Sequence, residues 1–204
     1  MTIYIHEQDL PEHVTFDGDV AVDAEMMGLS TFRDRLCLVQ LSDGKGDQHL
    51  VRIHQGQADA PRLKALLEDP KVTKIFHYAR KDVVTMKVWL DISCAPIYCT
   101  KVASKLIRTY TDKHSYKTLV KEFLNIDISK EEQTTNWGAD TLTDVQKEYA
   151  AGDVLYLHQL RDKLNNMLVQ AGRMELAQAC FDFLPVRAAL DVAGWEDIDI
   201  FAHH

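Results

Sequence analysis

Residues 19–25 read Asp19-Val20-Ala21-Val22-Asp23-Ala24-Glu25, and this stretch predicts both a strand and the start of a site. The run from Asp19 to Asp23 is short and apolar, which is typical of a strand inside a sheet. Asp23 and Glu25 stand where that strand ends, and residues two apart on a strand point to the same side. The stretch therefore predicts two converging carboxylates, although a polar strand end that enters a loop has the same pattern.

The remaining elements are predicted from hydrophobic periodicity and from turn residues. Further strands are expected at 36–41, 49–53, 74–76 and 97–99, and helices from Pro61 and at 79–89, 101–107, 115–123, 143–172 and 174–183. The turn-rich segment 42–47 predicts a hairpin, and Pro185 predicts the end of the last helix. This order indicates an α/β fold: a mixed sheet, with an antiparallel hairpin plus parallel strands, flanked by helices and followed by a helical C-terminal half.

A third carboxylate is predicted to face the same edge of the sheet. Asp82 lies just inside the helix that follows the strand at 74–76. Ligands in α/β folds favour the edge formed by the carboxyl ends of the strands. The alternative is that Asp82 is a first-turn acid that complements the helix dipole.

The fourth carboxylate belongs to the segment Tyr149-Ala150-Ala151-Gly152-Asp153. Spacing of i to i+4 on a helix places the Tyr149 phenol and the Asp153 carboxylate on one face. The small residues between them predict close approach of another backbone or of a ligand, since Gly152 inside a helix costs about 1 kcal/mol relative to Ala and requires a reason. The alternative is a buried tyrosine beside a surface aspartate.

Together the four acidic side chains offer enough oxygen ligands for two divalent cations, Mg²⁺ or Mn²⁺, roughly 3.5–4 Å apart. Such a pair suits phosphodiester hydrolysis. One ion activates the attacking water, and the other stabilises the leaving 3′ oxygen.

At these residues the sequence resembles the tyrosine subclass of the DEDD exonucleases, in the ribonuclease D-like group. The residues that carry the resemblance are Asp23-x-Glu25, His77 to Asp82 and Tyr149-x-x-x-Asp153. The resemblance implies a ribonuclease H-like exonuclease fold, a single 3′-5′ exonuclease domain over residues 1–204, and catalytic roles for Asp23, Glu25, Asp82, Tyr149 and Asp153. In the histidine subclass a His precedes the last Asp by five residues, whereas Glu148 stands there in this chain. With an ordinary pKa near 10, the Tyr149 phenol is expected to orient the attacking water rather than to act as a base.

Within that group the sequence is similar to the nano-RNase C proteins, through segments 33–41 and 194–203. This similarity implies degradation of dinucleotides and other short single-stranded RNA to mononucleotides, and assembly into a homo-octamer. Ribonuclease D proteins commonly carry Trp-x-x-Arg-Pro-Leu before the final motif. Here Trp137 is followed by Gly138-Ala139-Asp140, which argues against tRNA-type substrates.

Four further residues are candidates for substrate binding. Met26 and Leu29 follow the first acidic pair and are expected to border the 3′ nucleotide. By resemblance Leu29 wedges between the last two bases, a contact worth about 1–3 kcal/mol per stacked base, unless it closes an edge of the core. His77 either bonds the substrate or fills the core at a strand end, and Arg108 is a candidate for the terminal 5′ phosphate because its planar fork bonds two oxygens.

The composition limits the remaining possibilities. The net charge is -8, which is unusual for a protein that handles nucleic acid, but residues 71–121 alone carry +8. The four cysteines form no C-x-x-C pair, no apolar run could span a bilayer, and no secretory leader is recognisable, so we expect a reduced, cytoplasmic protein. Two alternatives stay open: a broader 3′-5′ exonuclease that trims longer RNA or DNA ends, and a non-catalytic RNA-binding module on the same fold.

Overall fold

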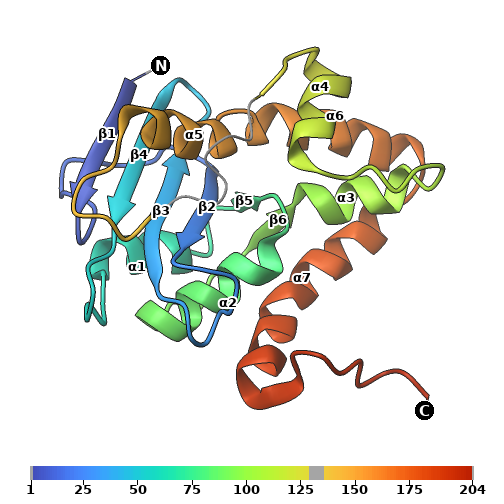
Figure 1. Cartoon of the computed structure of the whole chain (residues 1–204). Coiled ribbons are helices and arrows are strands. Elements are labelled where there is room, and N and C mark those ends of the chain that lie inside the picture. Colours follow the sequence, from blue (N-terminus) through green and yellow to red (C-terminus); the bar gives the residue numbers. More distant parts are fainter. Residues whose placement is uncertain (1, 129–135, 204) are drawn as a thin grey trace.

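The computed structural model describes residues 2–128 and 136–203, and these residues build one mixed sheet with helices around it (Figure 1). The strands are β1 (Thr2–Glu7), β2 (Val20–Met26), β3 (Leu36–Ser42), β4 (Asp47–Arg52), β5 (Lys74–Phe76) and β6 (Ile97–Cys99). Their order across the sheet is β1-β4-β3-β2-β5-β6. The predicted mixed sheet is confirmed.

The hairpin predicted around segment 42–47 is formed by β3 and β4, which pair antiparallel and bring Ser42 opposite Gln48. Strand β2 pairs antiparallel with β3 and parallel with β5, and β5 pairs parallel with β6. Strand β1, which no sequence pattern predicted, pairs parallel with β4 at the edge of the sheet. Tyr4 and Ile5 of β1 are both exposed to solvent. The strand therefore lacks the alternation of buried apolar and exposed polar residues by which a strand is predicted.

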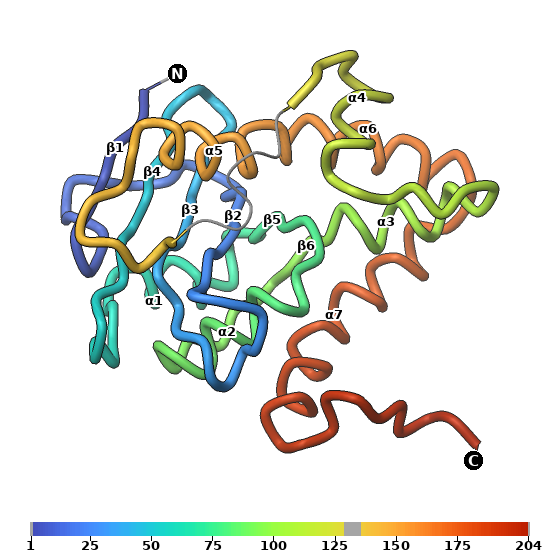
Figure 2. Tube along the Cα trace, viewed as in Figure 1, coloured from blue at the N-terminus to red at the C-terminus, as the bar shows by residue number. Residues whose placement is uncertain are grey.

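Helices cover the sheet and extend beyond it in the second half of the chain. They are α1 (Pro61–Glu68), α2 (Ala79–Leu90), α3 (Thr100–Ile107), α4 (Tyr116–Leu124), α5 (Asp144–Leu155), α6 (Leu157–Gln170) and α7 (Met174–Leu190), followed by a π-helical turn at Asp191–Trp195. Helix α5 lies across β2, β3 and β4, whereas α6 packs on α3 and β5 (Figure 1). After α7 the chain runs away from the sheet to the C-terminus (Figure 2).

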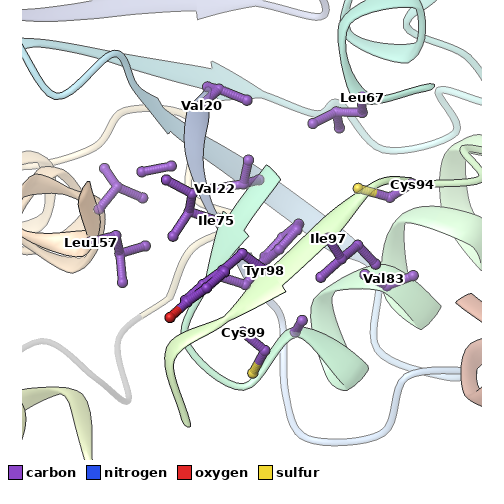
Figure 3. Packing of buried hydrophobic residues seen from close by; sticks show 14 of the residues in the cluster. Val20, Val22, Leu67, Ile75, Val83, Cys94, Ile97, Tyr98, Cys99 and Leu157 are labelled. Carbon is purple, nitrogen blue, oxygen red and sulfur yellow. The ribbon is translucent and has the colours of Figure 1, made fainter. Parts of the chain in front are cut away.

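The core fills both sides of the sheet. Figure 3 shows its larger part, in which Val22 and Ile75 of neighbouring strands meet Leu157 of α6, and Tyr98 of β6 lies beside them. A smaller cluster lies under α5. Its buried members are Cys37, Leu38, Leu50, Trp137, Leu142 and Ala150. Each large apolar side chain that is fully buried stabilises the fold by about 1.5–3 kcal/mol, so both clusters hold α5 in place over the sheet.

The single helix predicted over 143–172 is wrong, because the structure divides it at Tyr156. Tyr156 has φ -107° and ψ 3°, outside the helical range. The hydroxyl of Tyr116 donates a hydrogen bond to the Gly152 carbonyl at 2.8 Å and accepts one from the Tyr156 amide at 3.2 Å. Those two backbone groups would otherwise bond each other, since they stand four residues apart. A side chain inserted into the helical ladder is a known cause of a sharp bend.

The predicted stop at Pro185 is also wrong, since α7 continues through that proline to Leu190. Proline inside a helix removes one hydrogen bond and costs about 3 kcal/mol. Phe181, Leu184 and Ala188 are buried on both sides of Pro185 and lie on one face of α7. Their packing outweighs the lost bond.

Among the residues that the structure describes, no helix combines the length and the apolar character needed to cross a membrane.

Candidate active site

The site begins at the end of β2, where strand alternation turns Asp23 and Glu25 to the same side of the sheet. The pairing with β3 shifts register between Glu25 and Met26, which marks a bulge. Bulges re-aim side chains and end regular pairing. The two predicted carboxylates therefore point out of the sheet together, at the place where the chain leaves it.

Helix α5 brings a third carboxylate to this pair. One oxygen each of Asp23, Glu25 and Asp153 can be chosen so that all three lie within 4.8 Å of one another. This separation is short enough for one cation to bind all three. Asp153 owes its place to α5, because that helix crosses β2 and β3.

Asp82 lies beside this group without joining it. Its side chain is buried, with 8% of its surface exposed, and it accepts a hydrogen bond from the backbone amide of Ala24, between the two acids of β2. Its charge is the strongest of the neighbouring charges that act on Asp23. The structure thus brings all four predicted carboxylates into one region, three of them in direct reach of a common ion.

Burial and mutual repulsion hold these acids in an unusual state. Loss of hydration is the main cause that raises the pKa of Asp23 well above its ordinary range, and the charges of Asp82 and Asp153 add to it. Burial raises the pKa of Glu25 to about 9, that of Asp82 to about 8 and that of Asp153 to about 7. Within residues 2–128 and 136–203, no Lys or Arg forms an ion pair with any of the four. Such a group of acids takes up either protons or cations.

Tyr149 stands one helical turn before Asp153, as the spacing predicts, and its hydroxyl is hydrogen-bonded to the Asp153 carboxylate. That bond lowers the pKa of Asp153 against the larger effect of burial. Burial and the neighbouring carboxylates raise the pKa of Tyr149 above its ordinary value of 10. The phenol therefore stays protonated, and it can hold a water molecule but cannot serve as a base near neutral pH.

The acids form part of the wall of a pocket of about 560 Å³. Other lining residues include Met26, Leu29, His77, Tyr78, Lys81, Lys101, Ser115, Tyr116, Lys117, Trp137 and Tyr149. Leu29 has 86% of its surface exposed, so the alternative that it closes an edge of the core is wrong. The volume falls in the range of pockets that enclose small ligands.

His77 lies at the end of β5, in the wall of the pocket, so contact with a substrate stays a prediction. It lines the pocket, and its Nδ1 lies 2.9 Å from the Thr100 hydroxyl, which in turn donates to the carbonyl of Phe76. Burial, aided by the charge of Lys101, lowers the pKa of His77 to about 3. A neutral imidazole held at a strand end can bond a substrate but carries no charge toward a phosphate.

The prediction that Arg108 binds the terminal 5′ phosphate is wrong, because Arg108 does not line the pocket. Its side chain is 1% exposed and donates to the Ser104 hydroxyl, to the Lys113 carbonyl and to Glu122. The sequence showed a cation in a basic segment but not the acid that pairs with it. Buried and bonded in this way, Arg108 holds α3 to α4.

The basic residues that do reach the pocket are Lys81, Lys101 and Lys117. The structure places Lys81 near Glu25 and Asp82, where its charge favours their ionised forms. All three belong to the segment 71–121 that carries the positive charge excess. That excess was the only signal in the sequence that pointed to them.

For Gly152, one of the two expected neighbours is wrong. A Cβ at this position would meet nothing within 4 Å, so no other backbone packs against it among the described residues, and close approach of a ligand stays a prediction. The close approach occurs instead at its carbonyl, which accepts the hydrogen bond from Tyr116.

A sheet edge that gathers four carboxylates, under a helix that adds a tyrosine, defines a class of protein: the metal-dependent nucleases. Comparison with known proteins agrees. Residues 5–169 match the model of a 3′-5′ exonuclease family. The chain belongs to this family, and within it to the ribonuclease D-like DEDD exonucleases.

Among curated proteins, ribonuclease D of Acidiphilium cryptum is 33% identical over 156 residues, and that of Haemophilus influenzae is 35% identical over 152 residues. These matches cover 76% and 74% of the chain, but the chain spans only 39% and 37% of the length of these relatives.

The structural match to NrnC of Brucella melitensis covers both chains in full. The form with bound Mg²⁺ superposes with a TM-score of 0.95 at 46% identity, and the form bound to pGG with 0.96 at 47%. Escherichia coli RNase D superposes with a TM-score of 0.75 at 27% identity, over 88% of this chain and 48% of its own. The chain is therefore close to NrnC.

Proposed function

We propose that this chain is a single-domain 3′-5′ exoribonuclease that degrades short oligoribonucleotides and dinucleotides to mononucleotides. The observation that carries the proposal is the group of four carboxylates in the wall of the pocket, of which Asp23, Glu25 and Asp153 come within 4.8 Å of one another. The relatives support the same class of substrate, because an NrnC structure is bound to pGG and the curated relatives are ribonuclease D proteins.

We further propose two divalent cations, Mg²⁺ or Mn²⁺, held by Asp23, Glu25, Asp82 and Asp153. The donor set fits, because these buried carboxylates have raised pKa values and form no ion pair in the described part of the chain. When bound, the cations supply a more acidic water and neutralise the charge that grows on the leaving 3′ oxygen. A Brucella melitensis NrnC that binds Mg²⁺ supports this assignment.

The protein's own groups then orient the reactants. Tyr149, protonated and bonded to Asp153, would position the attacking water. Met26 and Leu29 would border the last nucleotide, with the exposed Leu29 against the base. Neutral His77 would bond the sugar or the base rather than a phosphate.

The proposed preference for short substrates is supported by the polar residues that share the pocket with the carboxylates. Lys101, Ser115 and Lys117 line it, and they take the place that we had assigned to Arg108. A substrate of two nucleotides would present a 5′ phosphate there while its 3′ end reaches the carboxylates. A single pocket that holds both the carboxylates and these cations suits a short chain better than an open groove does.

A series of substrate lengths tests this function. Purified protein with Mg²⁺ or Mn²⁺ is expected to release mononucleotides from a 5′-phosphorylated diribonucleotide faster than from seven- or twenty-nucleotide RNA, and chelation should abolish the reaction. Equal rates on long RNA or on DNA ends would favour the broader exonuclease. Binding of RNA without turnover in Mn²⁺ would favour the non-catalytic module.

For assembly we propose a homo-oligomer, an octamer by family resemblance, that associates through the C-terminal surface. The large apolar side chains exposed along α7 and the segment after it are Leu176, Phe183, Val186, Val192, Trp195, Ile198, Ile200 and Phe201. Contiguous exposed apolar residues of this kind mark association surfaces. Light scattering on the purified protein measures the mass directly, and a monomer would refute this assignment.

For location we propose the cytoplasm. All four cysteines are free thiols in the structure, and Cys37, Cys94 and Cys99 are buried. Free thiols are kept reduced in that compartment.

A further inference from the structure

The break between α5 and α6 lies in the turn that carries Asp153. In an unbroken helix the Tyr156 amide would donate to the Gly152 carbonyl. Both groups instead bond the hydroxyl of Tyr116, which stands between them and joins helix α4 to this turn. Asp153 directly follows Gly152, so the hydroxyl fixes the backbone on which that carboxylate sits.

Tyr116 also belongs to the site itself. It lines the pocket, and its ring centroid lies 5.8 Å from that of His77. Ser115 and Lys117, its neighbours in the sequence, line the same pocket. Tyr116 therefore stands at the start of α4, where that helix lines the pocket, and not only in the core.

We propose that Tyr116 is a positioning residue for Asp153: its hydroxyl holds the helix break that directs this carboxylate toward Asp23 and Glu25. The proposal rests on the metal-binding role proposed above for the three acids. Without the hydroxyl, the Gly152 carbonyl and the Tyr156 amide are free to bond each other. The turn then becomes regular helix and Asp153 leaves the geometry that a shared ion requires.

The test is the substitution Tyr116→Phe, read out as affinity for Mn²⁺ in the absence of substrate. Partners that orient metal ligands typically contribute 10–100-fold to affinity, so a loss of at least about 10-fold is expected. Electron paramagnetic resonance of free Mn²⁺ gives the affinity, and circular dichroism shows that the variant is folded. An unchanged affinity in a folded variant overturns the proposal.

Tyr98→Phe is the matched control. Tyr98 is equally buried and lies in the core (Figure 3), and its hydroxyl has no hydrogen-bond partner in the described structure. Loss of that hydroxyl is expected to leave Mn²⁺ affinity unchanged. A similar loss in both variants would mean that any removed core hydroxyl weakens the site, which contradicts a specific role for Tyr116.

A measurement on the unaltered protein covers the case in which Tyr116→Phe does not fold. Coupling between two sites is reciprocal, so bound Mn²⁺ should stabilise the Tyr116 contact by the same factor. Hydrogen exchange at the Tyr156 amide is expected to slow by about 10-fold with Mn²⁺, more than at Leu164 in the middle of α6. Equal slowing at both amides overturns the proposal, whereas a protein that binds no Mn²⁺ at all refutes the proposed function instead.

Discussion

At the level of single residues, the geometry of the site depends on which strand or helix carries each carboxylate. Asp23 and Glu25 are fixed by strand alternation, and Asp153 is fixed by a helix that must cross the sheet above them. Repulsion among these acids is tolerated because the core around them is large. Residues kept for function in this way typically cost stability.

The first prediction concerns Asp153→Ala. Removal of one of three converging oxygens is expected to lower kcat by at least about 100-fold, since even partners outside the ligand set contribute 10–100-fold. Tyr149→Phe keeps all the acids and is expected to lose less, about 10-fold, because it removes only a group that orients water. Single-turnover rates on a diribonucleotide with Mg²⁺ measure both losses.

The control for this prediction is Glu148→Ala, which removes an exposed acid from the same helix without touching the pocket. Its rate should match that of the unaltered protein. Full activity in Asp153→Ala, or equal losses in Glu148→Ala and Asp153→Ala, would contradict the assignment of the site.

Sequence reasoning reached the acids and Tyr149 because their spacing is a local property of strands and helices. It failed for Arg108, since the partner Glu122 that neutralises it stands fourteen residues away. The positive charge excess of residues 71–121 did not single out Lys81, which lines the pocket from the first turn of α2. Side-chain pairing across elements leaves no periodic signal in one sequence.

At the level of elements, short buried strands were the most predictable. The predicted ranges 74–76 and 97–99 coincide with β5 and β6, because both strands are buried over their whole length and carry mostly apolar side chains. Strand β1 escaped prediction because it lies at the exposed edge. The break in the helix at Tyr156 was not predicted, because the residue that causes it, Tyr116, lies forty residues earlier in the chain.

The second prediction concerns Pro185 in α7. Alanine at this position restores a backbone donor that can reach the Phe181 carbonyl, and Pro costs about 3 kcal/mol relative to Ala inside a helix. Proline also lowers the conformational entropy of the unfolded chain, and its loss would cost the folded state about 0.4–1 kcal/mol of stability. Pro185→Ala is therefore expected to raise the free energy of unfolding by about 2–2.6 kcal/mol, measured by urea denaturation with an unchanged m-value. A decrease would show that the ring itself packs against the core.

At the level of the whole molecule, the acidic site links stability to pH. The unfolded chain releases its carboxyl protons near pH 4, whereas the folded chain keeps them until the pKa values of Glu25 and Asp82, about 9 and 8, are reached. Between these limits the folded state binds more protons than the unfolded state. Its stability without metal must then fall as pH rises.

The third prediction is a difference between two pH values. In EDTA the melting temperature is expected to be lower at pH 8.5 than at pH 5.5, and Mg²⁺ should raise it more at pH 8.5, because protons compete with cations for the same oxygens. Glu25→Gln removes one of the acids with the highest pKa and should weaken both effects. Differential scanning calorimetry on the two proteins at both pH values measures them. Equal stabilisation by Mg²⁺ at pH 5.5 and pH 8.5 would contradict binding by these carboxylates, because protons would then not compete with the cation for their oxygens.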